Sequence, residues 1–265
     1  MNLVKQALLS TLGEKKYLSL LAGSFQKIYP LGLPGESYQD IYFLKKMIRP
    51  GAFCVDIGAH LGYYTFELSR LAGESGKIFA IEPMSKFNKT LERLLEKKKI
   101  RNVTLYQVAL GGSEAFVEMG IPLVNNQKKF AYARIMKTSG HLQYIESEKV
   151  PNESGDHLFR DLSRLDFIKC DVEGLEVAVF SSMMEVIAAH HPVLLCELGD
   201  KTDRITLSQM LSPLGYRCYL LKNKTLHLLD VYSDEKAVSH NHYFIPDERK
   251  ADIIPFLATA SGSQR

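Results

Sequence analysis

The stretch from Ala52 to Gly62 places an acidic side chain and two glycines after a short apolar run. Residues 53–55 have the composition of a buried parallel strand, and Asp56 follows where such a strand would end. Gly58 and Gly62 then bracket a tight turn into a segment with helical apolar spacing. A strand, an acid, a glycine turn and a helix predict the first crossover of a doubly wound α/β sheet, where ligands bind at the carboxyl ends of strands.

The spacing of these glycines indicates what the turn could bind. Dinucleotide-binding loops carry Gly-x-Gly-x-x-Gly, whereas here Gly58-x-x-x-Gly62 follows Asp56. The Asp56 carboxylate would repel a diphosphate and attract an ammonium group. A ligand with an amino-acid end and a ribose but no phosphate suits this loop, and S-adenosylmethionine is such a ligand. The alternative is a sharp strand-to-helix turn without a ligand, because glycine is common in turns.

Two further strand ends could complete the same site. A second strand over residues 77–81 ends in Glu82-Pro83, about 20 residues beyond the glycine loop, where an acid commonly holds ribose hydroxyls. The alternative is a solvated charge at a strand end. A third strand over residues 103–106 is followed by Val108 and Ala109, whose backbone we expect beside an adenine ring.

A second group of charged residues follows another apolar strand, in Lys169-x-Asp171-x-Glu173-Gly174. Burying Lys169 beside two carboxylates is costly unless the charges pair or take part in chemistry. Gly174 then leads into a segment with helical apolar spacing. Because this cluster would lie at the mouth of a strand, beside the expected ligand, we interpret it as functional.

Composition narrows the class of protein. The chain has 265 residues, 46% apolar and 24% charged, with a net charge of +3, which is too mild to indicate nucleic-acid binding. Its four cysteines lie in apolar runs without metal-type spacing, so we expect buried thiols in a reducing compartment. We find neither a secretory signal nor an apolar stretch of the roughly 18 residues that a membrane span needs. The expected location is cytoplasmic.

The apolar spacing in the rest of the chain predicts the helices and strands that must position these residues. Residues 1–49 predict an N-terminal helical extension that acts as a lid or brace, in preference to a membrane or partner helix, and residues 50–265 form the main domain. Within it, residues 111–150 break the strand–helix alternation and predict an antiparallel or loop insertion that selects the substrate. Further strands are expected at 192–198, which contains Glu197, and at 216–221, 225–229 and 242–245.

With these motifs in place, the chain resembles the FkbM family of S-adenosylmethionine-dependent methyltransferases over roughly residues 38–200. Members share Val-Asp-x-Gly-Ala-Asn-x-Gly, a later Glu-Pro, an Ala-Leu after the third strand, and Lys-x-Asp-x-Glu-Gly-x-Glu. Here these stand at residues 55–62, 82–83, 109–110 and 169–176, and a Pro-x-x-x-x-Glu strand fits residues 192–197. One departure is His60, which replaces the usual asparagine and is either a base near the sulfonium or a hydrogen-bonding substitute; we favour the substitute.

The resemblance implies a class I methyltransferase fold, with a Rossmann-like sheet of seven strands, the last antiparallel, flanked by helices. The glycine loop would hold the methionine end, Glu82 the ribose, and residues 108–110 the adenine. The expected cofactor-binding residues are Asp56, Gly58, Ala59, His60, Gly62, Glu82, Pro83, Val108, Ala109 and Asp171. Characterised members mostly methylate hydroxyl groups, often on sugars or secondary metabolites, which makes a small-molecule or saccharide hydroxyl the expected acceptor.

For methyl transfer to a hydroxyl, we expect Asp171 or Glu173 to accept the proton and Lys169 to orient them. A metal could be held by the set Asp171, Glu173 and Glu197, but the working hypothesis is a metal-independent reaction. An RNA or protein methyltransferase of the same fold would call for an Asn/Asp-Pro-Pro-Tyr motif or a basic face, and neither is present. A nicotinamide- or nucleotide-binding protein would need the missing phosphate loop. The identity of the acceptor and the oligomeric state, a homo-oligomer included, stay open.

Overall fold

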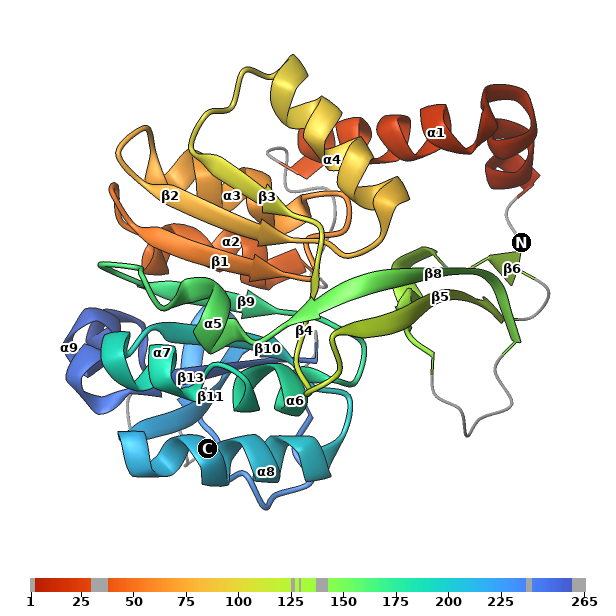
Figure 1. Cartoon of the computed structure of the whole chain (residues 1–265). Helices are drawn as coiled ribbons and strands as arrows, with labels where there is room; N and C mark the ends of the chain where they lie inside the picture. The colour runs from red at the N-terminus through yellow and green to blue at the C-terminus, as the bar shows by residue number, and fades with distance from the viewer. Residues whose placement is uncertain are drawn as a thin grey trace.

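The computed structural model describes residues 3–29, 38–124, 127–128, 130–136, 143–236 and 240–258. In this part of the chain the main sheet has eight strands, in the order β12-β11-β13-β10-β9-β1-β2-β3 (Figure 1). The strands are β1 (Phe53–Ile57), β2 (Lys77–Ile81), β3 (Val103–Tyr106), β9 (Phe167–Cys170), β10 (Val193–Glu197), β11 (Tyr216–Lys222), β12 (Thr225–Leu228) and β13 (Asn241–Pro246).

Strand directions follow the expected α/β pattern. The five strands from β10 to β3 each pair in parallel with the next, while β13 is antiparallel to both β10 and β11. The predicted fold class is confirmed, but the predicted number of seven strands is wrong. The additional strand is β12, which returns beside β11 through a turn at Asn223 and Lys224, whose φ values of 50° and 63° suit a tight hairpin.

Strand register brings the candidate site residues to one edge of the sheet. Asp56 of β1 lies opposite Lys169 of β9, and Lys169 lies opposite Leu195 of β10. Glu197, at the end of β10, lies opposite Asn241, the first residue of the antiparallel strand β13. The amino end of β13 therefore meets the carboxyl ends of the parallel strands.

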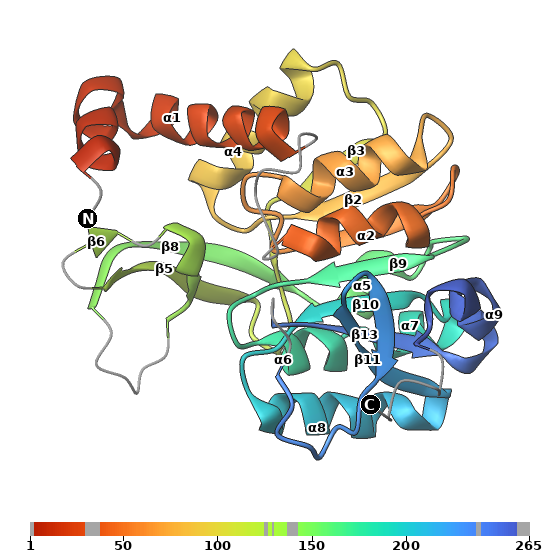
Figure 2. The same ribbon diagram turned by 180° about the vertical axis from the view of Figure 1, so that it is seen from behind.

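Helices cover both faces of the sheet, because alternate strand residues point to opposite sides. On the face seen in Figure 1, α5 (Gly155–Phe159), α6 (Glu176–Ser181), α7 (Met184–His190) and α8 (Lys201–Leu211) pack on one apolar cluster. On the opposite face, seen in Figure 2, α2 (Gln39–Met47) and α3 (Tyr63–Ala72) pack on a second cluster. Two further helices are α4 (Ser85–Lys97) and α9 (Lys250–Ile253). All four cysteines are buried free thiols.

The N-terminal helix α1 (Leu3–Ile28) bends at Gly13, where φ is 72°. It packs on α4 and shares a charged cluster with the inserted region, in which Glu14 and Glu146 each pair with Lys86 and Lys128. No helix in the described ranges is long and apolar enough to cross a membrane.

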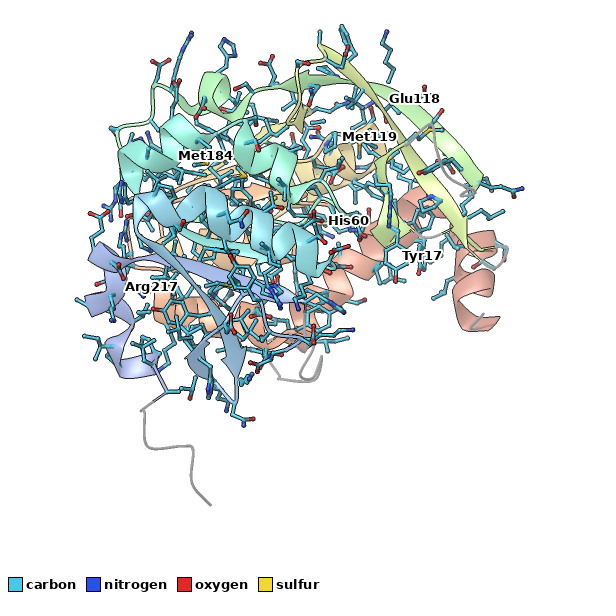
Figure 3. All side chains as sticks on the ribbon, turned by 90° about the horizontal axis from the view of Figure 1, so that it is seen from below. Tyr17, His60, Glu118, Met119, Met184 and Arg217 are labelled. Atoms are coloured by element: carbon cyan, nitrogen blue, oxygen red, sulfur yellow. The ribbon has the colours of Figure 1, made fainter. Side chains whose placement is uncertain are left out.

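The inserted region forms a second, smaller sheet beside the main one. Its strands are β5 (Phe116–Val124), β6 (Gln127–Lys128), β7 (Arg134–Ile135) and β8 (Gln143–Glu153), and β8 also pairs with β4 (Ala109–Leu110). β5 and β8 pair antiparallel over most of their length, as expected for this stretch. Figure 3 labels Met119 of β5 and Tyr17 of α1; both are buried in one apolar cluster, which joins the insertion to α1 and α4.

Candidate active site

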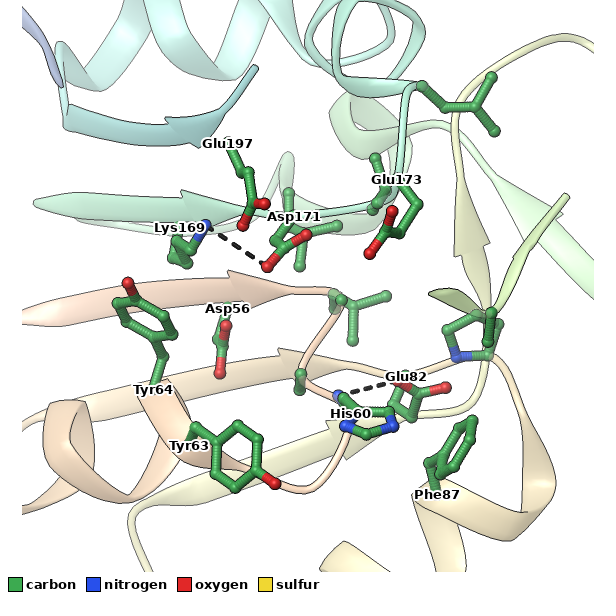
Figure 4. Close-up of a pocket in the computed structure, with 18 of the residues that line it drawn as sticks. Asp56, His60, Tyr63, Tyr64, Glu82, Phe87, Lys169, Asp171, Glu173 and Glu197 are labelled. Atoms are coloured by element: carbon green, nitrogen blue, oxygen red, sulfur yellow. Dashed lines mark hydrogen bonds and ion pairs between the residues drawn. The ribbon is translucent and has the colours of Figure 1, made fainter. Parts of the chain in front are cut away.

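A cavity of about 650 Å³ lies at the carboxyl ends of β1, β2, β9 and β10 (Figure 4). Nearly all the candidate residues line it: Asp56, Gly58, Ala59, His60, Glu82, Pro83, Val108, Ala109, Lys169, Asp171 and Glu173. Gly62 is the exception, because it is absent from the cavity wall and packs against Leu91 and Phe66. The structure thus brings together residues that are more than one hundred positions apart in the sequence.

The glycine loop is held by backbone contacts that leave no room for side chains. The amides of Gly58 and Ala59 both donate to the carbonyl of Ile81, at 3.0 and 2.9 Å. Gly58 has a φ of 82°, and a Cβ there would lie 1.8 Å from the carbonyl oxygen of Asp171. Gly62 has a φ of 83°, and a Cβ there would approach Leu91 within 2.6 Å. Glycine at both positions is therefore a steric requirement.

Glu82 fixes the far side of this loop. Its carboxylate accepts hydrogen bonds from the backbone amides of His60 at 2.8 Å and Met84 at 2.9 Å (Figure 4). Burial raises the pKa of Glu82 to about 7, although the two amides favour the ionised form. Carboxylate oxygens accept more than one hydrogen bond each, so this group can also accept from ligand hydroxyls.

Asp56 lies deeper in the cavity. Burial raises its pKa to about 6, while the Thr65 hydroxyl, which donates to its carboxylate at 2.5 Å, acts in the opposite direction. A buried carboxylate in this position gives the floor of the cavity a negative potential that favours a cationic ligand group.

Lys169 and Asp171 lie close together on the opposite wall. Lys169 is 1% exposed, its Nζ lies 3.8 Å from Asp171, and it stands over the ring of Tyr64 at 5.1 Å. Burial alone would lower the pKa of Lys169, but the Asp171 and Glu197 carboxyl groups hold it above its ordinary value. Figure 4 shows Glu197 beside this pair. Burial and the Asp171 carboxylate raise the pKa of Glu197 to about 8.

Glu173 differs from its neighbours, because it pairs with the insertion. Its carboxylate lies 3.2 Å from the guanidinium of Arg134 on β7, and its backbone φ is 59°. Burial and the Asp171 carboxylate raise the pKa of Glu173 to about 7, while Arg134 opposes this rise. The expected grouping of Lys169 with Asp171 is confirmed, whereas Glu173 forms its ion pair with Arg134.

His60 connects the glycine loop to the insertion. Its ring packs on Phe87 with centroids 4.2 Å apart, and it hydrogen-bonds the backbone of Phe130. Burial lowers the pKa of His60 to about 4, so the imidazole is neutral near pH 7. The imidazole Nε2 has no hydrogen-bond partner among the described residues, and the role of His60 as a substitute for asparagine stays a prediction.

From the sequence, no role was expected for several residues of the wall, among them Tyr64 and Asn241, nor for Arg134, which pairs with the wall residue Glu173. Glu197 was considered only as a metal ligand, although its place at the end of a predicted strand could have included it among the candidate acids. The sequence signal for Asn241 is weaker. This residue stands just before the strand predicted at 242–245, and the sequence does not reveal which strand pairs with that one. Among the described residues, no three His, Cys, Asp or Glu side chains are placed to hold a metal ion, and a metal-independent reaction stays a prediction.

Comparison with known proteins defines the class. A sequence model of the methyltransferase FkbM domain matches residues 56–227, more than half of the chain. A search of curated proteins finds no match. The chain belongs to the FkbM methyltransferase family, and S-adenosylmethionine is its cofactor.

Three solved structures illustrate its structural relatives. Methyltransferase FkbM from Methylobacillus flagellatus KT is 18% identical over 77% of this chain, with a TM-score of 0.48, and this chain spans 50% of that one. A SAM-dependent O-methyltransferase from Thermotoga maritima is 16% identical, covering 78% of this chain and 63% of its own, with a TM-score of 0.43. A SAM-dependent methyltransferase from Aquifex aeolicus is 16% identical, covering 83% and 96%, with a TM-score of 0.39.

The chemistry of the cavity wall fits S-adenosylmethionine. The sulfonium and ammonium groups of this cofactor are cationic, and Asp56, Asp171 and Glu197 supply acidic partners. Glu82 offers acceptors to ribose hydroxyls, and Phe87 and Leu110 offer apolar surface to a purine. The residues that would hold the cofactor thus come from the ends of β1, β2 and β9 and from the segment after β3.

Proposed function

We propose that the chain transfers a methyl group to a hydroxyl of a small molecule or sugar. The observation that carries this proposal is the cluster of Lys169, Asp171 and Glu197 on the cavity wall opposite the glycine loop. Transfer to a neutral hydroxyl requires a group that takes up its proton at the reacting oxygen. A carboxylate beside a buried ammonium and a protonated neighbour has this capacity near neutral pH.

Bound S-adenosylmethionine supplies an electrophilic methyl group. The cavity wall must then hold the acceptor oxygen about 3 Å from that methyl group and in line with it. Asp171 accepts the hydroxyl proton, and the Lys169 ammonium, 3.8 Å from its carboxylate, orients it. Glu173, paired with Arg134, is the alternative base at the rim of the cavity. The low-dielectric surroundings strengthen each of these charge interactions.

The regions outside the strand ends have proposed roles as well. Residues 1–49 act as a lid, a role supported by Tyr38 and Ile41, which line the cavity from α2 and the turn before it. Residues 111–150 select the acceptor, a role supported by Met119, Phe130 and Ile135 in the same wall.

Calorimetric titration with S-adenosylhomocysteine, with NADH as the control ligand, tests the cofactor half of the proposal. Glu82→Ala removes a charged hydrogen-bond acceptor worth about 1.5–3 kcal/mol, so we expect roughly 10- to 100-fold weaker binding. Glu92→Ala, on the exposed side of α4, is the matched control and leaves the affinity unchanged. Binding of NADH without binding of S-adenosylhomocysteine would contradict the assignment of the loop.

Turnover tests the acceptor half. Purified protein is incubated with S-adenosylmethionine and panels of hydroxylated and amine compounds, and products are identified by mass spectrometry. We expect methyl ethers, and we expect Asp171→Asn to reduce turnover by at least about 100-fold at saturating S-adenosylmethionine. Methylation of amines alone would contradict hydroxyl transfer, and near wild-type turnover in both Asp171→Asn and Glu173→Gln would contradict the assigned base.

A further inference from the structure

A line of buried polar side chains leads from Lys169 to the N-terminal helices. Lys169 Nζ donates to Asn241 Oδ1 at 3.0 Å and to the backbone carbonyl of Cys170 at 3.2 Å. Asn241 Nδ2 donates to Asp40 Oδ2 at 3.1 Å, and the hydroxyl of Tyr243 donates to Asp40 Oδ1 at 2.9 Å. Each of the four residues in this line is at most 5% exposed. Their hydrogen bonds therefore form without competition from water.

We propose that Asp40 and Asn241 are positioning residues, which aim the Lys169 ammonium at the carboxyl groups of Asp171 and Glu197. This inference rests on the proposed function of that cluster. Asp40 lies on α2 and Asn241 begins β13, so neither falls within the family match over residues 56–227.

The orientation of the Asn241 amide carries the argument. An amide presents an acceptor on one side and two donors on the other, and an ammonium can only donate. Lys169 therefore requires the amide oxygen, whereas Asp40 accepts from the amide nitrogen. Because the Asp40 carboxylate can only accept, the amide has one favourable orientation between its two partners.

The position of the ammonium is the property that this line controls. An ammonium that loses a buried acceptor turns toward the remaining ones or toward water. Among the described residues, the remaining partners of Lys169 include the Cys170 carbonyl, the Tyr64 ring and the more distant carboxyl groups of Asp171 and Glu197. Asn241 thus sets how closely the positive charge faces the group that is proposed to accept the proton.

An exchange of the two side chains tests the proposal. Asp40→Asn supplies donors that can turn the Asn241 amide, so that its nitrogen faces Lys169 and the acceptor is lost. The double variant Asp40→Asn/Asn241→Asp restores an acceptor toward Lys169 and a donor–acceptor pair between positions 40 and 241. Tyr243→Phe is the control, because it removes only the hydrogen bond to the other oxygen of Asp40.

The readout is the ¹H–¹⁵N correlation of the Lys169 ammonium, assigned by its absence in Lys169→Met. We expect a slowly exchanging signal in wild type and Tyr243→Phe, its loss in Asp40→Asn, and its return in the double variant. We also expect turnover to fall at least about tenfold in Asp40→Asn with the affinity for S-adenosylhomocysteine retained, and to recover in the double variant. A wild-type ammonium signal in Asp40→Asn, or a double variant no better than the single one, would overturn the proposal.

These outcomes separate the positioning proposal from the proposed function. If the ammonium signals behave as expected but no hydroxyl compound is methylated, the positioning role stands and the acceptor assignment fails. If methyl ethers form but the signal and turnover of Asp40→Asn match wild type, the acceptor assignment stands and the positioning role fails.

Discussion

The glycine loop and the charged cluster face each other across one cavity, but different forces hold them in place. At Gly58 the loop has no space between its own backbone and that of Asp171, where a Cβ would lie 1.8 Å from the carbonyl oxygen. On the other wall, Lys169, Asp171 and Glu197 are side chains held by hydrogen bonds and charge interactions. One half of the site is defined by shape and the other by charge.

This difference determines how each half of the site responds to substitution. Substitutions in the loop act through atoms that collide, so they are expected to be severe and insensitive to pH. Substitutions in the charged cluster change protonation and orientation, so their effects depend on pH and can be compensated by a second substitution. The predictions below test this division.

The largest effect is expected for Gly58→Ala. The new Cβ would overlap the Asp171 carbonyl, and the φ of 82° is itself unfavourable for alanine by about 1–2 kcal/mol. We expect at least about 100-fold weaker binding of S-adenosylhomocysteine by calorimetry, because either the loop or the end of β9 must move. The loss should be the same at pH 6 and pH 8.

Gly215→Ala is the matched control for this prediction. Gly215 has a φ of 78°, but a Cβ there would meet nothing within 4 Å. In this control, the unfavourable backbone conformation of alanine should lower the melting temperature. The affinity for S-adenosylhomocysteine should be unchanged. Equal affinities in Gly58→Ala and wild type would show that shape does not define the cofactor half.

The main features of this fold could be predicted from the sequence because they depend on local patterns. Apolar runs ending in Asp56, Glu82 and Asp171 marked three strand ends, and parallel strands bring such ends to one edge. The interpretation of residues 225–229 as a strand also agreed with β12, whereas the seven strands implied by the family resemblance did not. Here the local pattern was the better guide, because Asn223 and Lys224 form a tight turn that leads from β11 into β12.

Long-range pairings account for what the sequence could not predict. The contact between Asp40 and Asn241 joins positions 201 residues apart, and no periodicity reveals it. The pairing of Glu173 with Arg134 likewise depends on how the insertion folds back over the cavity. Gly62 was expected to bind the cofactor because of its spacing; it lies outside the cavity wall, beside Leu91 and Phe66, and its cofactor role stays a prediction.

An effect of intermediate size is expected for Glu197→Gln, and it should depend on pH. The pKa of Glu197 is about 8 in the folded chain, above its value of 4.5 in the absence of the fold. The protonated form therefore favours folding, and this contribution is full below about pH 4.5 and is lost as pH rises through about 8. Glutamine mimics the protonated form, so the variant should gain melting temperature relative to wild type as pH rises from about 5 to 8.

The difference between variant and wild type is the quantity to follow, because Asp56, Glu82 and Glu173 also have raised pKa values and contribute to the slope of wild type. We expect a relative gain of a few degrees, the size that about 1 kcal/mol has in a chain of this length. For the control Glu92→Gln, at an exposed position of α4, the difference in melting temperature from wild type should stay constant over this pH range. A constant difference for Glu197→Gln as well would mean that its pKa is not raised.

The smallest effect is expected for Arg134→Gln, which tests whether the insertion belongs to the charged half or to the shape-defined half. Arg134 and Glu173 are 28% and 24% exposed, so their ion pair should contribute less than about 1 kcal/mol to stability. Because Arg134 opposes the rise in the pKa of Glu173, its loss should move the ¹³C titration midpoint of the Glu173 carboxyl above about 7. Affinity for S-adenosylhomocysteine should stay within about twofold of wild type, as it should in Arg160→Gln, an exposed control. A large loss of affinity in Arg134→Gln alone would instead place this contact among those that shape the cofactor half.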